Sequence, residues 1–287
     1  MDKIDYRTLP PLAGGGACVI TGAASGIGLA AAKRFAAMGL PVALADLPGE
    51  ALDAALAAIR ADGGRAAAFP TDVSDPQALA RLSAAVFDQY KHVGVLMLNA
   101  AIGLNPGGTW KDAEAWRRLL SVNLWGVIDG AQAFLPKMVE QGRPGFVVMT
   151  GSKQGITSPP GNAAYNVSKA AVKAFAEAMQ HELRNTGGCP ISAHLLVPGF
   201  TYTGMTSARL PQKPPAAWTP DQVVEFMLES LARGDFYILC PDNDVDRATD
   251  EKRMAWTVGD LIENRPALSR WHPDWKARFE AFMASGG

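Results

Sequence analysis

Tyr165, Lys169 and Ser152 are the residues of this chain whose types and spacing could move a proton. Tyr165 and Lys169 stand four positions apart, and Ser152 precedes the tyrosine by thirteen. If residues 162–185 form a helix, this spacing puts the phenol and the ammonium on one face. A free tyrosine has a pKa of about 10, so a base near neutral pH needs a fall of roughly 2–3, part of which an adjacent cation can supply. Such a pair is also an ordinary feature of helix surfaces. Whether this one is catalytic therefore depends on the other motifs in the chain.

Length and composition favour a single α/β domain that acts on small molecules. The chain has 287 residues, of which 48% are hydrophobic, so it can bury a full core. Its net charge of −1 provides no basic surface for nucleic acid or anionic lipid. No apolar stretch reaches the length that crosses a membrane. The expected partners are small molecules or copies of the chain itself.

The N-terminus and the cysteines indicate a cytoplasmic protein without a metal centre. Residues 1–16 have the pattern of neither a signal peptide nor a transit helix, and we interpret them as a lead-in segment. Cys18, Cys189 and Cys240 are far apart, and the four histidines form no ligand cluster. We therefore expect reduced thiols and no zinc.

Short apolar runs alternate with alanine-rich stretches of helical length, the pattern of βαβ units in a parallel sheet. Several runs are continuous in Val, Leu and Ile, as expected for strands covered on both faces. The predicted strands are Ala17–Thr21, Val42–Ala45, Ala66–Pro70, Val93–Leu98, Phe146–Thr150, Ser192–Val197 and Phe236–Cys240. The predicted helices are Gly26–Met38, Glu50–Asp62, Asp75–Tyr90, Asp112–Glu140, Asn162–Arg184 and Pro220–Ala232. This pattern predicts one domain over residues 17–240, followed by a helical extension over residues 241–287 that packs on it.

A glycine turn follows the first predicted strand and leads directly into a helix. Gly22, Gly26 and Gly28 punctuate it, with Ser25 and Ile27 between them. Small residues let the backbone approach a pyrophosphate, which the N–H groups and positive dipole end of the helix can bind. The spacing differs from the strict dinucleotide fingerprint, so the evidence is the position between strand and helix.

Asp46, at the end of the second strand, favours NAD. It lies 24 positions after Gly22, near the offset at which a carboxylate accepts hydrogen bonds from the adenosine ribose. A 2′-phosphate there would face like charge. A solvated carboxylate at a strand end remains the alternative. Two further segments, Asp72-Val73 and Asn99-Ala100-Ala101, also follow strands, where ligands of open α/β sheets bind.

The chain resembles the classical short-chain dehydrogenase/reductase family, because it contains, in this order, the glycine turn, Asp46, Asp72-Val73, Asn99-Ala100-Ala101, Asn123, Ser152, Tyr165-x3-Lys169 and Pro198-Gly199. The resemblance covers residues 17 to about 240. It implies one Rossmann-like doubly wound domain, with a seven-stranded, mainly parallel sheet and helices on both faces. It also implies an NAD(P)-dependent alcohol dehydrogenase or ketoreductase that forms homodimers or homotetramers.

The resemblance assigns the catalytic roles. Tyr165 would be the general acid/base, and Lys169 would bind the nicotinamide ribose and lower the tyrosine pKa. Ser152 would hydrogen-bond the substrate oxygen, and Asn123 would hold a water that relays protons to Lys169. The implied NAD contacts are Gly22, Ser25, Gly26, Ile27, Gly28, Asp46, Leu47, Asp72, Val73, Asn99, Ala100, Ala101, Tyr165, Lys169, Pro198, Gly199, Thr201 and Thr203.

The chain also departs from the family pattern. Ala101 stands where the family has glycine, and Gly151 stands where another serine is common before the catalytic serine. Cys240-Pro241 and a longer tail replace the usual short ending. Residues 203–219, which contain several prolines, correspond to the family's substrate lid.

The predicted substrate contacts are apolar or aromatic. Besides Ser152, they are Gln154, Phe200, Tyr202 and Met205, with Ile102, Leu104 and Ile156 nearby. None of these is Arg or Lys, so the site is expected to take a secondary alcohol or ketone with a hydrophobic or aryl body rather than to clamp an anion.

Other interpretations keep the fold and change the function. A dinucleotide-binding regulator or scaffold without activity would be marked by loss of the tyrosine or lysine, and both are present. A dehydratase or epimerase of the extended relatives would usually carry a larger C-terminal domain. Trp256, Trp271 and Trp275 in the tail could close the pocket, bury a subunit contact or cover core.

Overall fold

The computed structural model describes residues 4–207 and 210–285, which form a doubly wound α/β fold. Seven strands pair in parallel in the order β3-β2-β1-β4-β5-β6-β7. This confirms the predicted seven-stranded sheet. The strands are β1 (Ala17–Thr21), β2 (Val42–Asp46), β3 (Ala66–Pro70), β4 (Val93–Leu98), β5 (Gly145–Thr150), β6 (Ile191–Val197) and β7 (Tyr237–Leu239).

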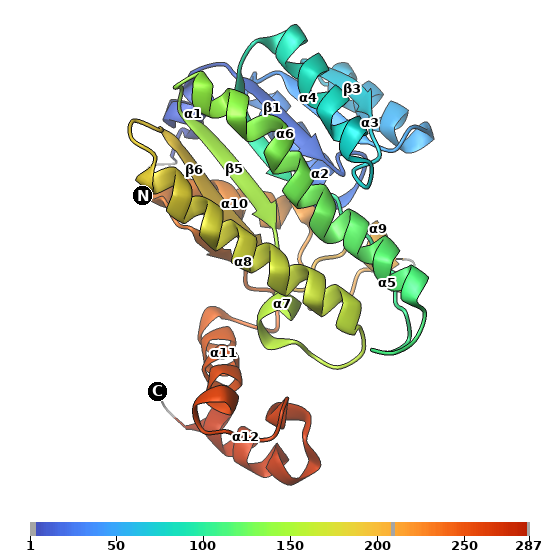
Figure 1. Cartoon of the computed structure of the whole chain (residues 1–287), viewed down its shortest axis with the longest axis vertical. Helices are drawn as coiled ribbons and strands as arrows, with labels where there is room; N and C mark the ends of the chain where they lie inside the picture. Colours follow the sequence, from blue (N-terminus) through green and yellow to red (C-terminus); the bar gives the residue numbers. More distant parts are fainter. Residues whose placement is uncertain (1–3, 208–209, 286–287) are drawn as a thin grey trace.

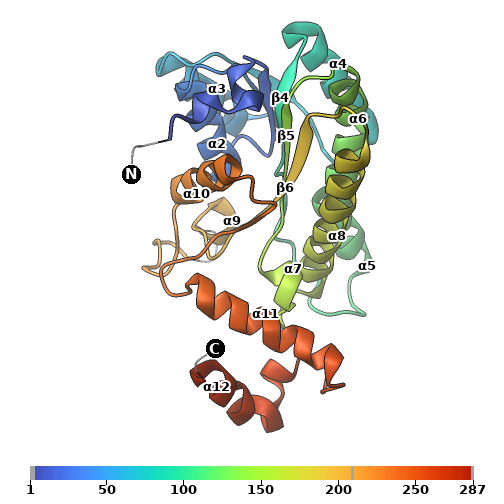
Figure 2. The same ribbon diagram turned by 90° about the vertical axis from the view of Figure 1, so that its left-hand side faces the viewer.

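Helices cover both faces of the sheet because alternate residues of each strand point to opposite sides. In β1, Ile20 belongs to the core on one face and Val19 to the core on the other, and both are fully buried. Figure 2 shows the two helical layers on either side of the sheet. One layer contains α2 (Gly26–Ala37), α3 (Glu50–Ala61) and α10 (Pro220–Arg233), and the other contains α4 (Pro76–Tyr90), α6 (Gly126–Glu140) and α8 (Ala163–Asn185).

The strand order reverses direction next to β1, whose two neighbours are β2 and β4. The connections that leave β1 and β4 therefore turn to opposite faces and open a crevice at the carboxyl ends of these strands. The glycine turn after β1 and the loop after β4 meet at this crevice. The fold thus brings together the segments that the sequence singled out.

The helix predicted over Asp112–Glu140 is not continuous. It begins as α5 (Ala113–Leu120), passes through a π-helical turn (Ser121–Trp125) and continues as α6. Such turns insert an extra residue into a helix and often mark functional sites. The turn contains Asn123, which is fully buried and satisfies its amide outside the helix, as described below. Apolar periodicity predicted the helix but could not show this interruption.

The remaining elements of the domain are short. They are a 3-10 turn (Tyr6–Thr8), α1 (Pro10–Ala13), α7 (Gln154–Thr157) and α9 (Gly204–Ser207). The Asn162 side chain caps α8 by accepting a hydrogen bond from the backbone N–H of Tyr165 at 3.2 Å. This cap sets where the helix that carries Tyr165 begins.

The C-terminal extension forms a separate helical layer beyond the carboxyl ends of the strands, next to α7 (Figure 1). It contains α11 (Arg247–Ile262), two 3-10 turns (Ser269–Trp271 and Pro273–Trp275) and α12 (Lys276–Ala284). Trp256 is buried at its centre, with its ring centroid 5.3 Å from that of Phe279 and 5.2 Å from that of Phe282. The extension therefore has a small apolar core of its own.

None of the helices in residues 4–207 and 210–285 has the length and apolar character needed to cross a bilayer. Within the same ranges, no group of three or more His, Cys, Asp or Glu side chains is arranged to hold a metal ion.

Candidate active site

A cleft of about 900 Å³ lies at the carboxyl ends of the strands, a size typical of small-molecule sites. Most residues expected to contact cofactor or substrate line it. They are Gly22, Ser25, Gly26, Ile27, Asp46, Leu47, Asp72, Val73, Asn99, Ala100, Ala101, Ile102, Ser152, Gln154, Tyr165, Lys169, Pro198, Gly199, Phe200, Thr201, Thr203 and Met205. Five predicted residues are absent from the lining: Gly28, Leu104, Asn123, Ile156 and Tyr202.

The glycine turn forms a cradle in which side chains would not fit. Gly22 has a φ of +67°, and a Cβ there would lie 2.8 Å from the Cα of Ala100. Gly26 has a φ of +53° and begins α2, so free N–H groups of the helix face the cleft. Gly28 is buried two residues further along the helix. A backbone cradle at a helix N-terminus fits a pyrophosphate group.

Asp46 fastens this turn to the end of β2. One carboxylate oxygen accepts a hydrogen bond from the backbone N–H of Ala24, and the other from that of Leu47, both at 2.8 Å. The carboxylate is therefore more than a solvated group at a strand end. It borders the cleft beside the glycine cradle, where an adenosine ribose would lie in a bound dinucleotide.

Asn99 ties together the ends of three strands. Its side-chain amide donates to the carbonyl of Thr21 at 3.1 Å, and its side-chain oxygen accepts from the hydroxyl of Thr150 at 3.1 Å. The hydroxyl of Thr21 accepts from the backbone N–H of Asn99 at 2.9 Å. Sequence reasoning did not assign roles to Thr21 and Thr150. Thr21 is the last residue of β1 and Thr150 is the last residue of β5, and this position at a strand end is what could have indicated a role for them.

Tyr165, Lys169 and Ser152 meet in the cleft, as their spacing suggested. Lys169 is buried in α8, and its ammonium donates to the carbonyl of Thr150 at 2.7 Å. The same nitrogen lies 5.7 Å from the centroid of the Tyr165 ring. The Ser152 hydroxyl lies close enough to the Tyr165 hydroxyl to lower the tyrosine pKa, and it accepts from the backbone N–H of Gln154 at 3.2 Å, at the start of α7. A hydroxyl pair beside a buried cation is suited to proton transfer.

The ionisation of this group differs from the sequence-based expectation. Burial lowers the pKa of Lys169 to about 8, because the ammonium has lost most of its hydration. Burial raises the pKa of Tyr165, and the nearby Ser152 hydroxyl opposes this rise only in part. The predicted lowering of the tyrosine pKa by Lys169 is therefore not a property of the chain by itself. Without a bound ligand, Tyr165 holds its proton at neutral pH.

Asn123 lies behind the cleft and shapes the loop after β4. Its side-chain oxygen accepts from the backbone N–H of Ile102 at 2.8 Å, and its side-chain amide donates to the carbonyl of Ile102 at 3.0 Å. Both hydrogen-bonding ends of the amide are thus used on one loop residue. The predicted role of Asn123 in holding a water stays a prediction.

Tyr202 was predicted to contact the substrate, but it does not line the cleft. Its hydroxyl donates to the backbone carbonyls of Leu210 and Pro211, at 3.0 and 3.1 Å, and so holds the predicted lid segment. Thr201 and Thr203, on either side of Tyr202, both line the cleft. Of the segment 203–219, residues 208 and 209 lie outside the described residues.

Two cations that sequence reasoning overlooked also border the cleft. Arg118 comes from α5, and Lys153 directly follows Ser152. Lys153 forms ion pairs with Asp242 and Asp250 in the segment after β7. The three tail tryptophans Trp256, Trp271 and Trp275 are absent from the cleft lining.

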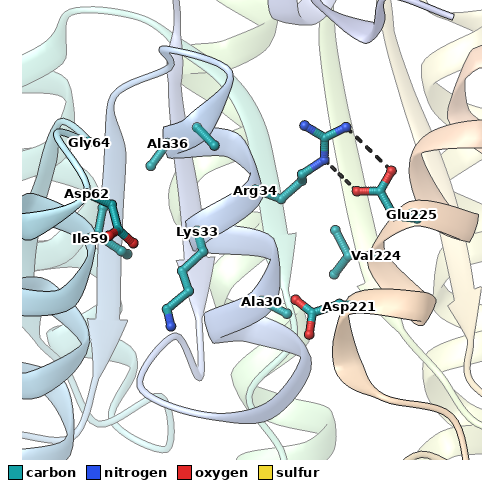
Figure 3. Close-up of a pocket in the computed structure, with 11 residues that line it drawn as sticks. Ala30, Lys33, Arg34, Ala36, Ile59, Asp62, Gly64, Asp221, Val224 and Glu225 are labelled. Atoms are coloured by element: carbon teal, nitrogen blue, oxygen red, sulfur yellow. Dashed lines mark hydrogen bonds and ion pairs between the residues drawn. The ribbon is translucent and has the colours of Figure 1, made fainter. Parts of the chain in front are cut away.

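A second, smaller pocket lies between α2, α3 and α10 (Figure 3). Arg34 and Glu225 form an ion pair across it, while Lys33, Asp62 and Asp221 add charges of both signs. None of its lining residues borders the cleft. We assign this pocket no part in the chemistry.

Known proteins resemble the chain over most of its length. A family model described as short chain dehydrogenase matches residues 17–214. The 1-deoxy-11-beta-hydroxypentalenate dehydrogenase of Streptomyces exfoliatus is 33% identical over 261 residues, which cover 89% of this chain and 94% of that protein.

Two solved structures show the same fold. A short-chain dehydrogenase/reductase from Burkholderia phymatum in complex with NAD is 30% identical, with a TM-score of 0.79 over 88% of this chain and 95% of that chain. A metagenomic short-chain oxidoreductase in complex with NADP is 26% identical, with a TM-score of 0.66 over 79% of this chain and 96% of that chain. Related folds therefore bind either dinucleotide.

Proposed function

Since the chain belongs to the short-chain dehydrogenase/reductase family, we propose that it interconverts a secondary alcohol and a ketone on a hydrophobic or aryl-bearing small molecule, with NAD as its cofactor. The observation that carries this proposal is the meeting of Ser152, Tyr165 and Lys169 in the cleft that the glycine cradle also borders. Proton transfer and dinucleotide binding can thus occur side by side.

The proposal gives each side chain one task. A bound nicotinamide would accept or donate the hydride. Tyr165 donates its proton to the carbonyl oxygen in reduction and takes it back in oxidation, and Ser152 holds that oxygen by a hydrogen bond. Lys169 contacts the cofactor ribose and supplies positive charge beside the phenol. Because the pKa of Tyr165 is raised, the phenol carries a proton at neutral pH that it could donate, although it is a weaker acid than a free tyrosine.

The side chains around the cradle are compatible with NAD. The backbone of Gly22 to Gly26 would hold the pyrophosphate, and Asp46 would accept hydrogen bonds from the adenosine ribose. Asp72 and Val73 would flank the adenine, while the loop from Pro198 to Thr203 would bind the carboxamide end. Because solved relatives bind NAD or NADP, the preference for NAD rests on the negative charge of Asp46.

Replacing Asp46 with Ser is expected to weaken the preference for NAD over NADP by about tenfold. A loss of roughly 1.4 kcal/mol of differential binding would suffice, and repulsion between a carboxylate and a 2′-phosphate is of this order. The measurement is the ratio of kcat/KM for the two cofactors. Asp53→Asn, in the first turn of α3, is the matched control for loss of one carboxylate. An unchanged ratio in Asp46→Ser would show that the carboxylate only supports the turn.

The proposed substrate class follows from the cleft lining. Ile102, Phe200 and Met205 supply apolar surface to the cleft that Ser152 also lines. The relative from Streptomyces exfoliatus is named for a hydroxylated substrate, 1-deoxy-11-beta-hydroxypentalenate, which supports an alcohol as the reduced partner.

The test is an absorbance screen at about 340 nm with NAD and with NADP against aliphatic, alicyclic, steroid and aryl alcohols. We expect turnover with at least one bulky class. Tight cofactor binding without turnover on any class would instead favour a non-catalytic regulator or scaffold.

We further propose that the protein acts in the cytoplasm as a homodimer or homotetramer. Exposed apolar side chains support self-association: Trp125 in the π-helical turn is 53% exposed, and Val167 on the adjacent α8 is 48% exposed. Sedimentation velocity would measure the oligomer. A monomer at micromolar concentration would contradict this part of the proposal.

A further inference from the structure

Lys153 joins the segment that carries Ser152 to the C-terminal extension. Its ammonium lies 2.6 Å from a carboxylate oxygen of Asp250, in the first turn of α11, and 3.5 Å from one of Asp242, just after β7. The side chain of Lys153 is 19% exposed, and those of Asp242 and Asp250 are 6% and 8% exposed. These ion pairs are unusual in being shielded from solvent, because most pairs between lysine and a carboxylate are solvated.

Asp242 extends the connection to the loop after β6. The oxygen that faces Lys153 also accepts a hydrogen bond from the backbone N–H of Phe200 at 3.1 Å. Its other oxygen accepts from the backbone N–H of Val245 at 2.9 Å, which shapes the approach to α11. Three segments thus converge on one ammonium: the Ser152 loop, the loop that begins at Pro198, and the extension.

The backbone of Gly199 is packed closely against the charged groups of Lys153 and Asp242. A Cβ on Gly199 would lie 2.9 Å from the Asp242 carboxylate and 3.0 Å from the Lys153 ammonium. Because the backbone of Gly199 is in contact with both charged groups, a shift of either one would be transmitted to the loop. Gly199 and Phe200 both line the cleft.

The charges of Lys153 and Asp250 stabilise each other in a poorly solvated site. Burial raises the pKa of the Asp250 carboxyl, Lys153 and to a smaller extent Arg253 oppose this rise, and Asp242 adds to it. Removing one partner of a buried pair leaves the other uncompensated, which costs more than the pair itself contributes. Asp250 makes the shorter of the two ion pairs of Lys153, so loss of its charge leaves the ammonium with Asp242 alone, at 3.5 Å, and weakens the link between the Ser152 loop and α11.

We propose that Asp250 is a positioning residue: through Lys153, the C-terminal extension holds Ser152 and the loop after β6 in the arrangement needed for turnover. This inference rests on the proposed function of Ser152 as the group that binds the substrate oxygen. It gives the extension, whose own core lies away from the cleft, a role in the reaction.

The experiment uses the full-length chain with Asp250→Asn, which keeps the size of the side chain and removes its charge. We expect kcat to fall about 10- to 100-fold, the effect of a misplacement near 1 Å, while the dissociation constant for NADH changes less than about twofold. Amide hydrogen exchange should accelerate in residues 151–158. Glu251→Gln is the matched control, because Glu251 is the next residue on α11 and pairs with Arg247 in solvent.

A double-mutant cycle separates positioning from general loss of folding. If Asp250 acts through Lys153, Asp250→Asn combined with Lys153→Gln should lose no more activity than Lys153→Gln alone. Additive losses, or an Asp250→Asn enzyme with parental kcat and parental exchange in residues 151–158, would overturn the inference. A parent chain without turnover would refute the proposed function instead, and the exchange data would still decide whether Asp250 orders the Ser152 loop.

Discussion

Tyr165→Phe is expected to lower kcat by about 10²- to 10⁴-fold in both directions of the reaction, the usual contribution of a general acid/base. The change removes one hydroxyl and leaves the ring in place. The hydrogen bond from Lys169 to the carbonyl of Thr150 does not involve the phenol, so the cofactor side of the cleft should keep its shape. The dissociation constant for NADH, measured by fluorescence titration, should therefore stay within about twofold of the parent value.

Tyr90→Phe is the matched control, because Tyr90 ends α4 and does not line the cleft. It should retain the parental kcat. Tyr165→Phe with the same kcat as the control, on any substrate that the parent accepts, would eliminate the phenol as the proton donor. Loss of NADH binding in Tyr165→Phe would also contradict the division of labour proposed for Tyr165 and Lys169.

Lys169→Met is expected to lower kcat/KM for the cofactor by about 100-fold or more. The variant keeps a long apolar stem in α8 but removes the charge beside Tyr165 and the proposed donor to the ribose. It also leaves the carbonyl of Thr150 without the donor at 2.7 Å, and an unpaired buried acceptor costs about 1–3 kcal/mol. Unlike Tyr165→Phe, this variant should bind NADH more weakly, and steady-state kinetics with isothermal titration will measure both effects.

The titration of Lys169 provides a check on the same residue. Its pKa is lowered to about 8, so the ammonium is charged below this pH and becomes neutral above it. The pKa of Tyr165 is raised, so the phenol remains protonated over the same range. In ketone reduction, kcat/KM for NADH reports the free enzyme and should fall as the pH rises past about 8.

Lys169→Arg should lack this fall, because a guanidinium keeps its charge throughout the range. An equal fall in the variant would assign the titration to a different group. Since the arginine is larger, the comparison concerns the shape of the pH profile and not the absolute rate.

Local patterns predicted the sheet and most of the cleft. Fully buried strands such as β1 and β4 appear as continuous apolar runs, and parallel strands have their carboxyl ends at one edge. The glycine turn, Asp46, Asn99 and Ser152 each follow a strand, so predicting the strands also placed these residues together. The spacing of Tyr165 and Lys169 needed only a helix, which the Asn162 cap and the apolar periodicity supplied.

Contacts between distant segments were not predictable in the same way. The π-helical turn depends on Asn123 bonding Ile102, 21 residues away, and apolar periodicity carries no record of such a bond. Tyr202 was placed in the cleft because its neighbours belong there, whereas its hydroxyl bonds the lid backbone. Nothing in the local sequence around Lys153 indicates that it pairs with Asp250, which lies 97 positions away.

The sequence by itself indicated the family, a seven-stranded parallel sheet and the candidate residues for proton transfer, because these depend on residue types and on patterns along the chain. Only the tertiary structure decided how those residues are charged and held. Burial, and not the neighbouring lysine, governs the pKa of Tyr165 in the free chain, since desolvation depends on everything packed around the phenol. The contact between Lys153 and Asp250 likewise exists only after folding, because it brings two charges from distant segments into one poorly solvated site.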